Sequence, residues 1–131
     1  MKNRKAGFTL IELLVVISII AILTVAGIIS FNKAGQSARD AKRKADLETV
    51  RQAMVQYRAN REGTGGYPTG ASGSFTDIVG VLYAADYLGT NDIKDPRDPS
   101  QSYSCESCTT TSFTLRATLE RTGSTYDLKN P

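Results

Sequence analysis

Three sets of residues in this sequence have types and spacings that could support chemistry. They are a carboxylate within an apolar run, a pair of cysteines, and three aspartates in a turn-rich segment: Glu12; Cys105 and Cys108; Asp92, Asp95 and Asp98. A carboxylate in lipid needs a cation or a route to water, paired thiols can form a disulfide, and aspartate oxygens can bind calcium. The sequence has no histidine and only two cysteines, which excludes a histidine-based catalytic site and a four-ligand zinc site within the chain.

Glu12 lies in the longest apolar stretch of the chain. The 22 residues from Phe8 to Ile29 carry no other charge. As a helix they would measure about 33 Å, which matches the roughly 30 Å hydrocarbon core of a bilayer. The sequence therefore predicts a membrane-spanning helix. An ordinary secretory signal is cut after its apolar region, whereas here the small residue that suits cleavage, Gly7, comes before it. Cleavage between Gly7 and Phe8 would leave the apolar helix attached and create a new amine on Phe8.

The residues K-A-G-F-T-L-I-E-L-L-V-V resemble the class III signal of bacterial type IV pilins and the related pseudopilins. Its features are a basic leader, here with Lys2, Arg4 and Lys5, then a glycine, an aromatic residue, and a glutamate four positions later. The resemblance implies that a prepilin peptidase cuts after Gly7 and that the Phe8 amine is then methylated. It also implies that Glu12 pairs with the Phe8 amine of a neighbouring subunit during assembly. A plain signal anchor, in which Glu12 has no role, is the alternative.

The same resemblance implies partners and a location. The partners are copies of this chain and other pilins, the prepilin peptidase, an inner-membrane assembly platform and membrane lipid. The location is the bacterial cytoplasmic membrane for the precursor, followed by a cell-surface or periplasmic filament. The formal charge of +3 comes from the leader, so the mature chain gives no global reason to expect a polyanionic partner. The basic run over residues 39–44 is diluted by acids and lacks interleaved aromatic residues, so nucleic-acid binding is not expected.

Residues 30–61 contain no proline and only one glycine, so the helix is expected to continue from near Phe8 to near Asn60. Ala34, Ala38, Ala41 and Ala45 form a small-residue stripe, and Leu47, Val50, Met54 and Tyr57 continue it with larger residues. The charged residues of this segment are expected on the other faces. Asp40 and Lys44 have the spacing of a favourable i,i+4 ion pair.

Residues 62–100 are expected to form a connecting loop with one short helix. The glycines from Gly63 to Gly73 end the long helix, and no phosphate-binding motif is present among them. Asp77 could cap a helix from Ile78 to about Ala85. The order of residues from Tyr87 to Tyr103 resembles the major type II secretion pseudopilins, some of which bind calcium in a nearby loop. Asp92, Asp95 and Asp98 could supply calcium ligands, but turn-capping is the favoured interpretation, and no cofactor is expected.

Residues 101–131 are expected to form an antiparallel sheet of about three strands on the long helix. The middle strand alternates, with Phe113, Leu115, Ala117 and Leu119 on one face. The strands before and after it are predicted at Ser102–Cys105 and Thr125–Lys129. Cys105 and Cys108 are expected to form a structural disulfide, because a strand follows them and not the helix that a redox site would use. Free thiols are the alternative.

The fold class expected is therefore α+β and pilin-like. Its parts are a leader at residues 1–7, a transmembrane or filament-core helix at 8–29, an amphipathic continuation at 30–61, the loop at 62–100 and the sheet at 101–131. No set of residues looks enzymatic, and the function expected is that of a structural filament subunit, in a pilus or a pseudopilus. The alternatives are a membrane-anchored binding module that never assembles, such as an adhesin or DNA receptor, and a membrane-tethered redox protein using Cys105 and Cys108.

Overall fold

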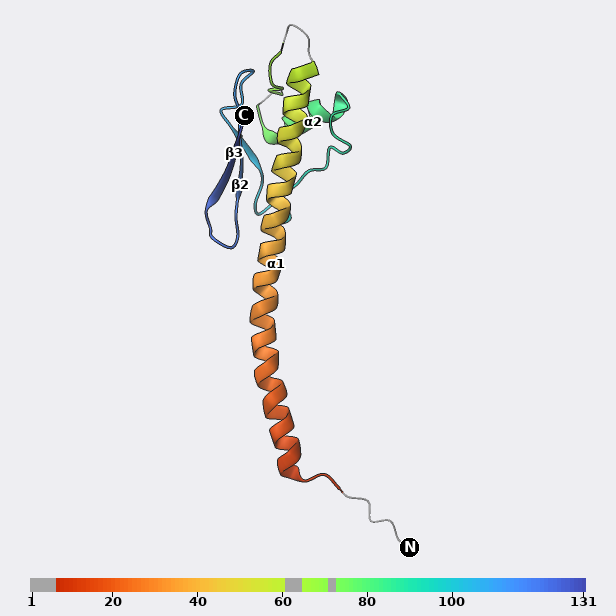
Figure 1. Ribbon diagram of the computed structural model, residues 1–131, viewed down its shortest axis with the longest axis vertical. Coiled ribbons are helices and arrows are strands. Elements are labelled where there is room, and N and C mark those ends of the chain that lie inside the picture. The colour runs from red at the N-terminus through yellow and green to blue at the C-terminus, as the bar shows by residue number, and fades with distance from the viewer. Residues whose placement is uncertain (1–6, 61–64, 71–72) are drawn as a thin grey trace. The chain divides into compact units, whose positions relative to one another are not determined.

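The computed structural model describes residues 7–60, 65–70 and 73–131, so the basic leader at residues 1–6 and the predicted helix stop near Gly63 lie outside the described residues. The elements follow the order α1, α2, β1, β2, β3 (Figure 1). Helix α1 extends from Leu10 to Asn60, which confirms the single long helix predicted from the sequence. The chain divides into two compact units, one ending at Gly35 and the other beginning at Gln36, and each is described by itself.

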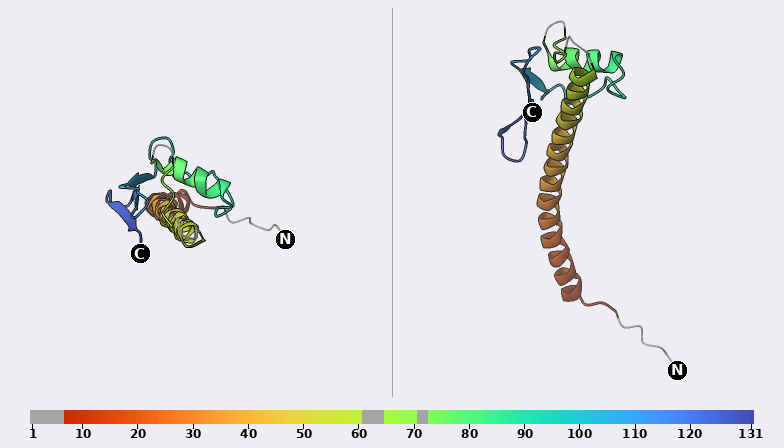
Figure 2. Two further views of the ribbon diagram at one scale, coloured as in Figure 1. Left: turned by 90° about the horizontal axis from the view of Figure 1, so that it is seen from above. Right: turned by 45° about the horizontal axis from the view of Figure 1, so that its top comes forward.

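The second unit has a core built on one face of α1. Leu47, Val50 and Met54 are fully buried there, and Tyr57 lies at the end of the same stripe. This confirms the apolar stripe predicted at helical spacing. The other members of the core come from α2, from the sheet and from the segments that connect these elements. Helix α2 and the sheet lie on different sides of α1 (Figure 2). The four alanines from Ala34 to Ala45 are exposed, so the core begins where the side chains become larger.

The sheet has three antiparallel strands in the order β1-β2-β3: Ser104–Glu106, Thr114–Thr118 and Thr125–Lys129. In the register, Leu115 lies opposite both Cys105 and Leu128. Phe113, Leu115 and Ala117 are at most 1% exposed, as their alternation predicted, whereas Leu119 is only half-buried. The α+β class and the three-stranded sheet are thus confirmed.

Strand β1 begins two residues later than predicted. Tyr103 is not in the ladder, because its ring is buried against Phe75 with centroids 5.1 Å apart and its hydroxyl donates to Asp46 at 2.7 Å. That fixes the residue in the core before pairing starts at Ser104, opposite Arg116. Burial and the hydrogen bond to Asp46 raise the pKa of the Tyr103 hydroxyl.

Helix α2 spans Phe75–Ala84, and the cap predicted at Asp77 was wrong. Ser74 is the N-cap: its backbone is extended, and its hydroxyl accepts a hydrogen bond from the Asp77 amide at 3.2 Å. Asp77 occupies the third helical position, so Ser74 and Asp77 have the spacing of a capping box. The turn before it requires glycine at position 70, where φ is +63° and a Cβ would come within 2.6 Å of the Asp77 Cβ.

Candidate functional site

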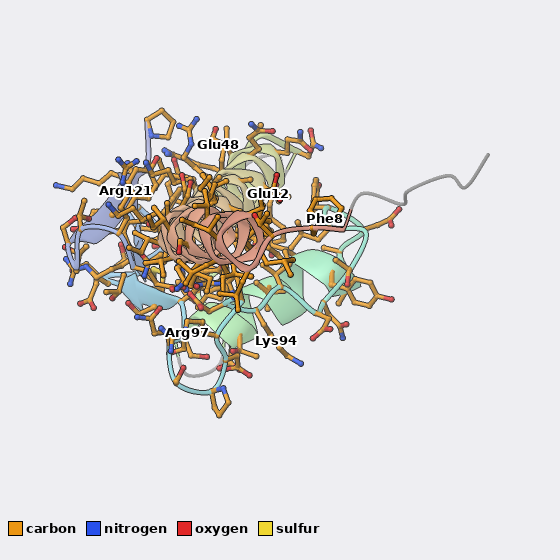
Figure 3. The ribbon with its side chains drawn as sticks, turned by 90° about the horizontal axis from the view of Figure 1, so that it is seen from below. Phe8, Glu12, Glu48, Lys94, Arg97 and Arg121 are labelled. Atoms are coloured by element: carbon orange, nitrogen blue, oxygen red, sulfur yellow. A yellow bond between two sulfur atoms is a disulfide. The ribbon has the colours of Figure 1, made fainter. Side chains whose placement is uncertain are left out.

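The peptide bond between Gly7 and Phe8 lies in non-helical, exposed chain before α1 begins. Nothing comes within 4 Å of the position of a Cβ on Gly7, and Phe8 is 83% exposed. Figure 3 looks onto this end of the chain, with Phe8 and Glu12 labelled. A protease needs its substrate in an open, extended form, because helical backbone bonds keep a peptide from entering an active site. The predicted cleavage position therefore has the local structure that cleavage needs.

Glu12 and Thr9 close the first turn of α1 as a reciprocal pair. The Thr9 amide and the Thr9 hydroxyl each donate to Glu12 Oε2 at 2.9 Å, and the Glu12 amide donates to Thr9 Oγ1 at 3.3 Å. This is a capping box, with Thr9 as the cap and Glu12 at the third helical position. The T-x-x-E spacing of this cap is present in the sequence, but the capping role of Glu12 was not among our predictions.

The second oxygen of Glu12, Oε1, has no donor within the described part of the chain. Beside it is an apolar depression of about 400 Å³, lined by Phe8, Ile11, Glu12, Val15 and Val16. A single chain thus satisfies one carboxylate oxygen and leaves the other open beside an apolar surface. This arrangement can accept a cationic donor from another molecule.

The first half of α1 exposes its apolar side chains on every face. Its most apolar window has a mean hydropathy of 2.9 with none of its residues buried, and this is the one helix among the described residues that is long and apolar enough to cross a membrane. Two of its hydroxyl groups are satisfied locally: the Ser18 and Thr24 hydroxyls donate at 2.7 Å to the carbonyls of Leu14 and Ile20. Such internal pairing is what a lipid environment demands. The segment therefore suits membrane anchoring.

In the second unit, Arg43 is fully buried, although we predicted that it would lie on a solvated face of the helix. Its Nε and Nη2 donate to the two oxygens of Asp95 at 2.6 and 2.8 Å. Nη1 donates to Asp40 at 2.8 Å, and Nη2 also reaches Glu120 at 2.7 Å and Gln101 at 2.9 Å. A buried guanidinium is tolerated only when its donors are satisfied in this way. Apolar periodicity does not predict that a charged residue is buried, so the sequence did not indicate this role of Arg43.

The predicted pair of Asp40 with Lys44 was also wrong. Asp40 accepts from Arg43 and from the backbone amides of Glu120 at 2.8 Å and Arg121 at 3.0 Å. Burial opposes ionisation of Asp40, but these hydrogen bonds together keep its pKa below the usual range. Arg39 donates twice to Glu120 at 2.8 Å. Two hydrogen bonds from Arg39, and a further one from Arg43, lower the pKa of Glu120 to about 2.

The three aspartates considered as calcium ligands do not share a partner. Asp95 is held by Arg43 and also accepts from the Arg97 amide at 2.8 Å, which is the turn-capping role that we favoured. Burial opposes ionisation of Asp95. The hydrogen bonds from Arg43 and from the Arg97 amide together outweigh burial, so the pKa of Asp95 is lowered. Asp92 pairs with Lys94. Over the described ranges, no three acidic or cysteine side chains gather as ligands for one metal ion.

Cys105 and Cys108 form a disulfide, as expected from the sequence. Cys105 lies in β1, and Ser107 turns the chain between the two cysteines with a φ of 53°. A hydrogen-bonded turn at Thr109–Ser112 follows, and not a helix. The bond therefore closes a small loop at the edge of the sheet and lacks the helix N-terminus that would activate a redox cysteine.

One comparison with known proteins, against family models, agrees with the N-terminal geometry. Residues 2–28 match the family model of the prokaryotic N-terminal methylation motif. Comparison with curated proteins and with solved structures gave no match. The motif points to a structural subunit and not to an enzyme. The residues before and within the first half of α1 thus carry the prepilin-type signal of type IV pilins and pseudopilins.

Proposed function

We propose that this chain is a structural subunit of a type IV pilus or pseudopilus filament. The observation that carries the proposal is the methylation motif at residues 2–28, which includes the start of an apolar helix whose most apolar window has no residue buried by the described part of the chain. A helix of this kind needs lipid before assembly and other apolar helices afterwards. The precursor would be held in the bacterial cytoplasmic membrane, and the mature subunit would join a cell-surface or periplasmic filament.

In this proposal the prepilin peptidase cuts between Gly7 and Phe8, and the amine of Phe8 is methylated. Glu12 of one subunit then pairs with the Phe8 amine of its neighbour, through the oxygen that Thr9 does not use. The partners are other copies of the chain, other pilins and the membrane assembly platform. A carboxylate and an ammonium in an apolar core are far less costly as a pair than apart, so the pair would align neighbouring subunits.

Two substitutions at Glu12 test the proposal and separate its two roles. Glu12→Ala removes both the cap and the charge, whereas Glu12→Gln retains an oxygen that can accept from Thr9 but removes the charge. Since removing one partner of a buried ion pair costs about 3–5 kcal/mol, both variants should give at least about a hundredfold less filament in cells with the peptidase and platform. Filament yield would be measured by electron microscopy and sedimentation, with processing followed by mass.

The Glu12→Gln variant decides between the proposal and a plain membrane anchor. A subunit that depends on the charge pair fails to assemble with glutamine, even though its first helical turn is still capped. Wild-type filaments from Glu12→Gln would show that only the cap matters, and would remove the assembly role of Glu12. An anchored binding module would be indifferent to both changes.

A further inference from the structure

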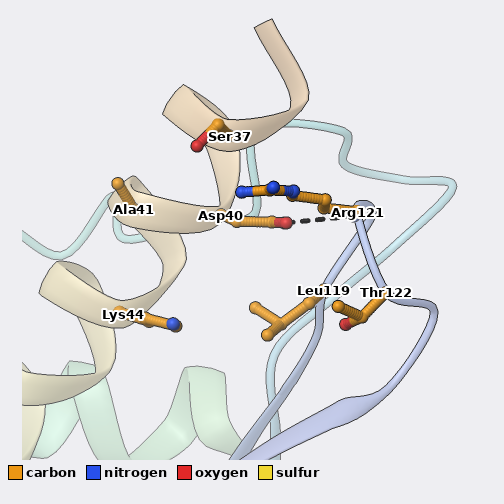
Figure 4. A pocket seen from close by; sticks show the side chains of 7 residues that line it. All are labelled: Ser37, Asp40, Ala41, Lys44, Leu119, Arg121 and Thr122. Atoms are coloured by element: carbon orange, nitrogen blue, oxygen red, sulfur yellow. Dashed lines mark hydrogen bonds between the residues drawn. The ribbon is translucent and has the colours of Figure 1, made fainter. Parts of the chain in front are cut away.

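The second unit has a pocket of about 420 Å³ between α1 and the turn that joins β2 to β3 (Figure 4). We call it the turn pocket, and its lining includes Ser37, Ala41 and Lys44 from α1, and Leu119, Arg121 and Thr122 from the turn. Asp40 fixes the turn against the helix through the backbone amides of Glu120 and Arg121. The shape of the pocket is therefore held by hydrogen bonds from two backbone amides of the turn to the Asp40 carboxylate.

The turn pocket is positively charged. Lys44 and Arg121 are exposed, and neither side chain has a carboxylate partner in the described part of the chain. The Lys44 ammonium lies 5.3 Å from the ring centroid of Tyr126. The one acid in the lining, Asp40, already accepts from Arg43 and two amides. The pocket thus combines two available cations with apolar side chains, and its natural ligand is an acidic group next to an apolar one.

The end of α2 presents such a surface. We define the α2 tip as Tyr83, Ala84, Ala85 and Asp86, all of which are exposed. Tyr83 is 47% exposed and is the one large apolar side chain with high exposure among the described residues of the second unit. Asp86 has a φ of 64°, which is uncommon for a residue other than glycine. Its carboxylate makes no hydrogen bond or ion pair within the described residues, so the tip offers an aromatic ring and a carboxylate together.

The turn pocket and the α2 tip lie at different levels along α1. The ring of Tyr87 packs on Tyr57 with centroids 5.6 Å apart, and Ala84 and Ala85 line a depression with the same Tyr57. Tyr57 is 13 residues beyond Lys44 in one helix, which corresponds to about 20 Å. The tip cannot reach the pocket of its own chain. A head-to-tail contact between two different surfaces of identical chains leaves one surface of each kind free at the ends, so it can propagate along a filament.

We propose that the α2 tip of one copy of this chain occupies the turn pocket of the next copy, with Asp86 facing Lys44 and Arg121. Tyr83 then packs on the apolar wall formed by Ala41 and Leu119. The inference rests on the proposed function, because it names the contact that links the second units of neighbouring subunits. It is separate from the apolar helix contact, since none of these residues lies in the first unit.

Charge reversal and rescue in the full chain test the contact. We would produce Lys44→Glu with Arg121→Glu, Asp86→Lys, and all three changes together, each beside the prepilin peptidase and assembly platform. Placing like charges across an interface opposes association, so each reversal should lower filament yield at least about tenfold and the combination should restore most of it. Lys129→Glu and Asp92→Lys are matched control reversals, on exposed residues outside both surfaces, and should assemble as wild type does.

Full assembly by both reversal variants, or no rescue by the triple change, would overturn the contact and leave the filament function standing. A second measurement does not depend on filament yield: Asp86→Cys with Thr122→Cys should give cross-linked ladders of the full chain in membranes under mild oxidation. Either single cysteine alone should give dimers at most. Absence of ladders from the double variant would overturn the contact even if the reversal variants misfold. A wild-type chain that forms no filaments would contradict the proposed function instead.

Discussion

The two halves of α1 share one helical backbone but differ in the burial of their side chains. Between Leu10 and Ile29 no side chain is buried, and the polar groups bond only to their own turn of helix. From Asp40 onward, one face is buried in a core and a charge network. The first half therefore makes no buried contact within the described part of the chain, and the second half depends on such contacts. Substitutions in the first half should change assembly with little effect on folding, and those in the second should do the reverse.

Acid should give the largest difference in stability between the two halves, because it protonates all the carboxylate partners of Arg43. The pKa of Glu120 is about 2, below its ordinary value near 4.3, and those of Asp40 and Asp95 are also lowered. A lowered pKa gives stability that is complete above the ordinary value and is lost as pH falls toward the folded value. The second unit should thus lose stability between about pH 5 and pH 2. Tyrosine near-ultraviolet circular dichroism of the full chain in detergent would follow this loss, and an unchanged unfolding midpoint over the range would contradict it.

Arg43→Ala should have the largest effect of any single substitution considered. It leaves Asp95, Asp40 and part of Glu120 without their buried cation, which costs about 3–5 kcal/mol. Urea unfolding of the full chain in detergent would measure the loss. Arg39→Ala is the control, because the Arg39 side chain is 39% exposed and its pair with Glu120 is partly solvated. Equal losses from the two variants would show that burial of the network is not what matters.

Leu47→Ala and Leu14→Ala place the same substitution in the two halves of α1, so their effects on unfolding free energy can be compared. Leu47 is fully buried, so its truncation should destabilise the second unit by about 2–5 kcal/mol. Leu14 is 53% exposed and has no core to lose, so the unfolding free energy of the second unit should stay within about 0.5 kcal/mol of wild type. The same urea titration measures both. A clear loss from Leu14→Ala would mean that the halves are not independent.

The double change Cys105→Ser with Cys108→Ser should have a smaller effect. The disulfide closes a loop of only a few residues, so the chain-entropy model gives about 2 kcal/mol. The second unit should unfold at lower urea concentration, and filaments should still form. Loss of a function with the fold and the filament intact would instead support a redox role for the pair.

Thr9→Ala should have the smallest effect, because it removes one cap at an exposed helix end, worth about 1 kcal/mol locally. Faster amide exchange in the first turn of α1 would be the readout, with no change in the unfolding of the second unit. The charge of Glu12 is retained, so assembly should be reduced far less than by Glu12→Gln. Equal losses of filament from these two variants would assign the role of Glu12 to helix capping.

The sequence predicted the features that depend on local spacing and did not predict those that depend on distant residues. Apolar length and periodicity predicted α1, the core stripe from Leu47 to Tyr57 and the alternation of β2, because burial of these residues is set by local spacing. The motif at residues 2–28 could be recognised because its parts are close together in the sequence. The network around Arg43 could not be, because its partners Asp95 and Glu120 are 52 and 77 residues away. From sequence alone a charged side chain is predicted to be solvated, because its distant partners are known only from the tertiary structure.

The most direct test of the proposed function is the intact mass and N-terminal residue of the chain made beside an active prepilin peptidase. We expect a mature chain that begins at methylated Phe8 and retains the whole of α1. A chain that stays uncut from Met1, while a control prepilin is processed in the same cells, would contradict it. That result would leave the first half of α1 as a plain membrane anchor for the second unit.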